Sequence, residues 1–251
     1  MKKITLENLV FKPCYYGFKF GRKDRLMELR DGHVYMKNLD FFIQEELKTG
    51  NKGRGDKDEA LMFFSNDVKA YDPHTHVLVF TAKAQVRDSN DRFKPVFCMM
   101  LKDLYRNPIS LDYPNLVTRI SFDMKLLEDF STDDKKPFVM VITDVGEFIN
   151  RIKKALEPSR LEIRQGFVSY RDTNALWKTE NGIEFNDAFC KKEIFKHQEE
   201  YRLLIDTKVE DHFDLNIGSL SDITEIIEAE NIIRNGIEVN ISIKEVIEIK
   251  E

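Results

Sequence analysis

Phe138-Val139-Met140-Val141-Ile142-Thr143 is followed directly by Asp144-Val145-Gly146-Glu147. This stretch decides the fold class, because a short apolar run rich in β-branched residues predicts a buried strand and the residues after it predict a helix. Asp144 and Glu147 have the spacing of a capping box, in which the first carboxylate accepts amides of the first helical turn. We therefore expect a strand at 138–143 and a helix at 145–156.

Strand-like and helix-like segments surround this unit on both sides. An aromatic strand is expected at the start of the chain, and the turn Asp31-Gly32 separates a short helix from the next strand. Asn38 has the position of a helix N-cap. The expected strands are 9–20, 33–36, 76–86, 94–101, 116–122, 138–143, 166–170, 200–207 and 237–242. The pattern predicts one α+β domain over residues 1–251, with a mostly antiparallel or mixed central sheet and peripheral helices.

Composition limits the class of protein. Lys and Arg total 39 and Asp and Glu total 44, a net charge of −5, which argues against a chain that depends on broad attraction to nucleic-acid phosphates. Three widely spaced cysteines predict neither a disulfide framework nor a zinc-binding pair. The uncharged apolar stretches are too short to span a bilayer, and the basic start meets Glu7 before any signal-like run. We expect a cytoplasmic protein without a membrane segment.

The segment from Phe195 to Asp206 is the most informative for function, because a dense polar cluster leads into an apolar strand. Alternation along the strand places Glu200 and Arg202 on one face, so that a carboxylate and a guanidinium point together into a cleft. The alternative interpretation is an exposed ion pair at a solvated strand edge. We expect a helix at Phe189–His197, which overlaps the start of this segment.

Gln198-x-Glu200 before an apolar strand resembles the Gln/Glu-x-Glu motif of ADP-ribosyltransferases, and the aromatic strand, short helix and Gly32 resemble the beginning of that fold. The whole chain also resembles an uncharacterised bacterial and phage protein family. The residues that carry this second resemblance are Asp31-Gly32-His33-Val34-Tyr35, Gly55-Asp56-Lys57-Asp58-Glu59 and Glu199-Glu200-Tyr201-Arg202.

The transferase resemblance implies an NAD-dependent enzyme, such as a toxin or defence factor acting on a protein or nucleotide. Glu200 would stabilise the oxocarbenium-like transition state, supported by Gln198 and Arg202. Tyr15, Tyr16, Ser169 and Tyr170 would bind the dinucleotide, the aromatic rings by stacking. The first strand carries neither the Arg nor the His of the family's first motif. A non-catalytic protein-binding or small-ligand-binding module is therefore the alternative.

Other site interpretations compete with simpler ones. Gly55–Glu59 could gather carboxylates around a hard cation, but Asp58 also suits the N-cap of a helix beginning Glu59-Ala60-Leu61. His74 and His76 invite a zinc interpretation, yet no third ligand is near, and we assign no metal ligand. The aromatic and basic residues around Tyr15 are typical of either a nucleic-acid groove or a core strand. Walker, GxSxG and Rossmann fingerprints are absent from the sequence.

Overall fold

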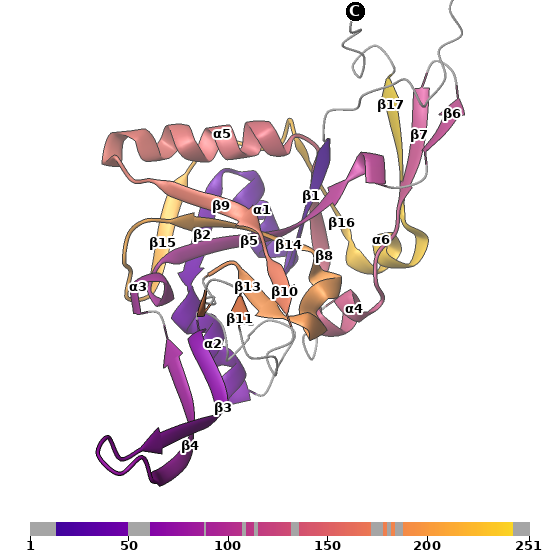
Figure 1. Ribbon diagram of the computed structural model, residues 1–251. Coiled ribbons are helices and arrows are strands. Elements are labelled where there is room, and N and C mark those ends of the chain that lie inside the picture. The colour runs from indigo at the N-terminus through magenta and orange to yellow at the C-terminus, as the bar shows by residue number, and fades with distance from the viewer. Residues whose placement is uncertain are drawn as a thin grey trace, which may run out of the picture. The chain divides into compact units, whose positions relative to one another are not determined.

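The computed structural model describes residues 14–49, 61–87, 89–106, 109–112, 115–131, 136–171, 178–179, 182–183 and 188–242. These residues form helices and mostly antiparallel strands, which confirms the α+β class (Figure 1). The chain divides into two compact units. The first comprises Met1–Asp31, Met100–Asn150 and Ser219–Glu251, and the second comprises Gly32–Met99 and Arg151–Gly218. The expectation of one domain over 1–251 stays a prediction.

Antiparallel strands form the framework of the first unit. Strand β1 (Tyr15–Gly21) pairs with the end of β5 (Pro95–Asp103) on one side and with β8 (Phe138–Ile142) on the other, and β8 pairs with β16 (Thr224–Glu228). A separate sheet has the order β17-β7-β6. Its strands are β17 (Ile237–Ser242), β7 (Asn115–Ile120) and β6 (Ile109–Asp112). The helices of this unit are α1 (Lys23–Arg30), α4 (Lys125–Phe130) and α6 (Ala229–Asn235), with the short η2 (Leu104–Arg106).

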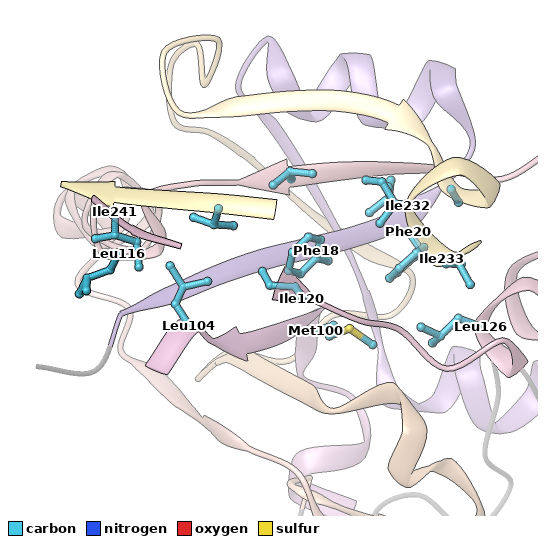
Figure 2. Packing of buried hydrophobic residues seen from close by; sticks show 14 residues of the cluster. Phe18, Phe20, Met100, Leu104, Leu116, Ile120, Leu126, Ile232, Ile233 and Ile241 are labelled. Atoms are coloured by element: carbon cyan, nitrogen blue, oxygen red, sulfur yellow. The ribbon is translucent and has the colours of Figure 1, made fainter. Parts of the chain in front are cut away.

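A cluster of buried apolar residues forms a core of the first unit (Figure 2). Phe18 of β1 is fully buried and meets the edge of Phe122 at a ring-centroid distance of 5.0 Å. Phe20 stacks on Phe130 at the same separation. The aromatic opening segment is therefore a core strand, and the nucleic-acid groove interpretation of its phenylalanines is wrong.

Helix α5 (Val145–Leu156) begins where the sequence predicts. The Glu147 amide donates to Asp144 Oδ1 at 2.8 Å, so Asp144 caps the helix. Asn38 plays the same part for α2 (Leu39–Thr49), because the Phe41 amide donates to Asn38 Oδ1 at 2.9 Å. Both capping predictions are confirmed.

Strand β2 (His33–Asn38) pairs with β15 (His212–Asn216) and with the start of β5 in the second unit. Strand β14 (Glu200–Ile205) pairs with β5 and, antiparallel, with β9 (Ile163–Phe167). Smaller pairs are β10-β13 (Ser169–Arg171 and Cys190–Lys192), β3-β4 (Leu61–Tyr71 and Leu78–Arg87) and β11-β12 (Lys178–Thr179 and Gly182–Ile183). The remaining helical turns are α3 (Ser89–Arg92), η3 (Glu157–Ser159) and η4 (Glu193–Gln198).

Two expectations about local structure are corrected in this unit. The helix expected to run from Glu59 through Leu61 is wrong at Leu61, which begins β3. The helix expected at 189–197 is replaced by β13 followed by the 3-10 helix η4. The carboxylate-rich segment 55–59 lies outside the described residues. Gly32 is required where it stands, because an added Cβ would lie 2.3 Å from the Gly218 oxygen and φ is +102°.

No helix in the described ranges combines the length and the apolar character needed to cross a bilayer.

Candidate functional site

The candidate site is built around β14 of the second unit. The apolar residues Leu203, Leu204 and Ile205 are fully buried, and they fix the strand in its sheet. At the start of the strand, the Glu200 amide donates to Tyr170 Oη at 2.8 Å, and the Glu200 carbonyl accepts from the Val168 amide at 2.9 Å. The backbone of Glu200 is thus held by Tyr170 of β10 and by Val168, the residue just before β10.

Four polar side chains meet in the interior beside this backbone anchor. Glu200 Oε1 accepts from Arg202 Nε at 2.6 Å, and Glu200 Oε2 accepts from Lys191 Nζ at 2.8 Å. The same Lys191 nitrogen donates to Gln198 Oε1 at 3.0 Å. Arg202 Nη1 also donates to the Ala188 carbonyl at 2.5 Å. We call Lys191, Gln198, Glu200 and Arg202 the buried charge cluster.

Burial distinguishes this cluster from a surface ion pair. The side chains of Arg202, Lys191 and Glu200 are only 1%, 6% and 7% exposed. The expected alternative of an exposed pair at a solvated strand edge is therefore wrong. Both oxygens of Glu200 are already hydrogen-bonded to cations, so the carboxylate is engaged by protein partners and not presented to solvent.

The electrostatics of the cluster keep Glu200 ionised. Burial by itself raises the pKa of a carboxyl group, but the adjacent charges of Arg202 and Lys191, together with hydrogen bonds from Arg202 and Cys98, lower the pKa of Glu200 well below its usual range. Burial and the charge of Glu200 raise the pKa of the Tyr170 phenol above its ordinary value. Glu200 is thus an anion and Tyr170 a neutral phenol throughout the physiological range.

A tight chain reversal brings the cluster together. Lys191 lies on β13, η4 follows directly, and Glu199 then turns the chain with a left-handed φ of 39°. The Lys191 ammonium also lies 5.1 Å from the ring centroid of Phe195, a buried residue of η4. The hydrogen bonds from Lys191 to Gln198 and Glu200 therefore close the loop between β13 and β14.

The structure places the sequence-predicted site residues in two groups. Gln198, Glu200 and Arg202 are brought together, and Tyr170 contacts the backbone of Glu200. Ser169 has an exposed side chain, and its amide donates to the Phe189 carbonyl at 2.8 Å. Tyr15 and Tyr16 belong to β1 of the first unit.

Lys191 is the member of the cluster that sequence reasoning missed. It lies nine residues before Glu200. Because a helix was expected at 189–197, the position of Lys191 on a strand was not predicted. A parallel pairing of Ser169–Arg171 with Cys190–Lys192 sets its direction, and nothing local in the sequence signals that pairing. Strand alternation could predict the pair Glu200 and Arg202, but not the third charge.

A second candidate site lies at the tip of the β3-β4 hairpin (Figure 1). Its large apolar side chains are 47% to 63% exposed. We call these residues the apolar tip: Tyr71, Val77, Leu78, Val79 and Phe80. Within the described ranges β3 and β4 pair only with each other. Sequence reasoning found the strand but not its exposure, although the uncharged run from Val77 to Ala82 is visible in the sequence.

The turn of this hairpin is well ordered by Asp72. Its carboxylate accepts from the amides of His74 and Thr75 at 2.9 and 2.7 Å. The backbone amide of Asp72 donates to the Val77 carbonyl at 2.9 Å, and His76 takes a left-handed φ of 56°. His74 and His76 are therefore residues of the turn, and β4 begins only at Leu78.

Comparison with known proteins finds no match among protein-family models, curated proteins or solved structures. The resemblance to ADP-ribosyltransferases and to the bacterial and phage family thus rests on the sequence motifs alone.

Proposed function

We propose that the chain is a non-catalytic protein-binding module that contacts its partner through the apolar tip. The exposure of four consecutive residues, Val77 to Phe80, is the observation that carries this proposal. Contiguous exposed apolar side chains mark interaction surfaces more often than isolated ones. The hydrogen bonds of Asp72 hold the turn in one shape, which lowers the entropy lost on binding.

The chemistry of the tip favours an apolar cleft on another protein as its partner. The run from Val77 to Ala82 carries no charge, so a charged partner surface would lose hydration without gaining an ion pair. A lipid bilayer is a poorer fit, because Asp72 lies at the turn and hydrogen bonds from Thr75 and His74 lower the pKa of its carboxyl group.

The buried charge cluster has an architectural role in this proposal. It ties β13, η4 and β14 together through Lys191, Gln198 and Glu200. The transferase alternative, with NAD bound by Tyr15, Tyr16, Ser169 and Tyr170, would need Glu200 to leave Lys191 and Arg202 in order to reach a ribose. We place the module in the cytoplasm.

Site-specific crosslinking tests the proposed surface. A photoreactive phenylalanine at position 80 is expected to crosslink one protein in source cells, and the same residue at exposed Met124 is not. The purified partner must then bind wild type and Met124→Asp equally and lose at least tenfold in affinity for Val79→Asp. Equal binding by Val79→Asp would overturn the proposal, as would crosslinking of a second copy of this chain alone.

A further inference from the structure

The β3-β4 hairpin lies between two helices of the second unit. Helix α2 precedes the hairpin along the chain, and α3 follows it (Figure 1). Within the described ranges the two strands pair only with each other. Their direction is therefore not set by a neighbouring strand of a larger sheet in that part of the chain. Among the described residues, contacts of the flanking helices are what fix the base of the hairpin.

One ion pair joins these two helices to each other. Arg92 of α3 donates from Nε to Asp40 Oδ1 of α2 at 2.6 Å, and a second guanidinium nitrogen pairs with the same oxygen. The side chains of Arg92 and Asp40 are 26% and 25% exposed. Because one helix precedes the hairpin and the other follows it, this pair closes the base of the hairpin.

A second set of charges ties α3 to strands β9 and β14. Asp91 Oδ1 accepts from Arg164 Nη2 of β9 at 2.5 Å, and it lies 3.0 Å from Lys94 Nζ. Lys94 Nζ also lies 2.8 Å from Oδ1 of Asp206, the residue that follows β14. Helix α3 is thus connected both to β9 and to the end of β14.

Asp91 is the centre of these contacts. Its side chain is 6% exposed, whereas the side chains of Lys94 and Arg164 are 14% and 44% exposed. Burial by itself raises the pKa of this carboxyl group, but hydrogen bonds from Arg164 and Lys94 and their charges lower the pKa below its ordinary value. The carboxylate is therefore an anion held between two cations that lie far apart in the sequence. Partly buried ion pairs are screened less by salt than exposed ones.

We propose that these charges form a positioning device that holds the β3-β4 hairpin in one direction relative to β9 and β14. We call its members the base network: Asp40, Asp91, Arg92, Lys94, Arg164 and Asp206. Helix α3 is tied both to the helix before the hairpin and to the strands of the sheet. The segment that follows β4 therefore cannot swing without breaking an ion pair. This device acts in the free protein and does not rest on the proposed function of the apolar tip.

Distances between two spin labels measure the direction of the hairpin in the full chain. The labels are attached to p-acetylphenylalanine at exposed His74 in the hairpin turn and at exposed Gln165 of β9. The native cysteines stay in place, because this residue is labelled without a thiol reagent. Wild type is expected to give one narrow distance distribution. Asp91→Asn and Arg92→Gln should each give a distribution about twofold wider, because the residues that flank the hairpin then act as a hinge.

Matched variants separate positioning by charge from general loosening. Glu193→Gln breaks the exposed pair with Lys196 in the same unit and should keep the wild-type width. Arg92→Lys keeps a cation beside Asp40 and should also remain narrow. Broadening in Arg92→Lys as large as in Arg92→Gln would show that charge does not hold the base of the hairpin, and it would overturn the proposal.

Circular dichroism establishes that each variant is folded. If Asp91→Asn does not fold, Arg92→Gln decides the matter, because it removes only the less buried pair. A width equal to that of wild type in folded Arg92→Gln or folded Asp91→Asn would overturn the proposal. Equal broadening in Glu193→Gln would overturn it as well, because the base network would then have no special effect on the hairpin.

Discussion

Glu200 and Arg202 lie two residues apart on β14, and Arg202 Nε donates to Glu200 Oε1 at 2.6 Å in the interior of the second unit. Lys191 supplies a second cation to the other carboxylate oxygen. These three side chains carry two positive charges and one negative charge. Removal of the carboxylate therefore leaves two neighbouring buried cations, whereas removal of Lys191 leaves one balanced pair.

Replacement of Glu200 by glutamine should destabilise the protein strongly. The shape of the side chain is retained, but Arg202 and Lys191 lose their shared counter-ion in a buried environment. Loss of one partner from a buried ion pair costs about 3 to 5 kcal/mol. Urea denaturation measures the change. The control Glu28→Gln breaks the exposed pair with Arg25 and should cost no more than about 1 kcal/mol.

Lys191→Met provides the matched comparison within the cluster. The methionine occupies a similar volume, and Glu200 keeps Arg202 as its counter-ion. We expect Lys191→Met to lower the free energy of unfolding by less than Glu200→Gln does. An equal loss of unfolding free energy in Glu200→Gln and Glu28→Gln would show that the buried charge cluster stabilises the protein no more than an exposed ion pair does. A larger loss in Lys191→Met would contradict the charge asymmetry.

Acid should weaken the folded state partly through Glu200. Its folded pKa lies below the unfolded value of roughly 4.3, so its stabilisation is complete above that pH and is lost as pH falls toward the folded value. Between about pH 4.5 and 2.5 the wild-type unfolding free energy should fall more steeply than that of Glu200→Gln, by up to about 1.4 kcal/mol per pH unit. Urea denaturation at each pH measures the unfolding free energies of wild type and Glu200→Gln. If the two fall equally steeply as the pH is lowered, this contribution of Glu200 is ruled out.

The cap of α5 should have a measurable effect on stability in the first unit. Asp144→Ala removes the acceptor of the Glu147 amide and should cost roughly 0.5 to 2 kcal/mol. Asp144→Asn keeps an oxygen in the same place and should retain most of the stability. Denaturation midpoints measure both, and equal losses in the two variants would show that the carboxylate charge, not the hydrogen bond, is what matters.

Local patterns predicted the parts of the fold that depend on neighbouring residues. The strand at Phe138, the helix after Asp144 and the Asn38 cap follow from apolar periodicity and capping chemistry. The burial of Glu200 could not be predicted this way, because it depends on β14 lying between β5 and β9. The partner Lys191 was missed because a helix was expected where a strand and a 3-10 helix lie. Long-range pairing decided both outcomes.

Nicotinamide release from NAD is the most direct test of the claim that Glu200 is architectural. Wild type at millimolar NAD should show no binding heat by calorimetry and no release above buffer, because the carboxylate is held by Arg202 and Lys191. Glu200→Gln, compared per folded molecule, should not differ from wild type. Release by wild type that falls by orders of magnitude in the folded Glu200→Gln fraction would contradict the account and establish Glu200 as catalytic.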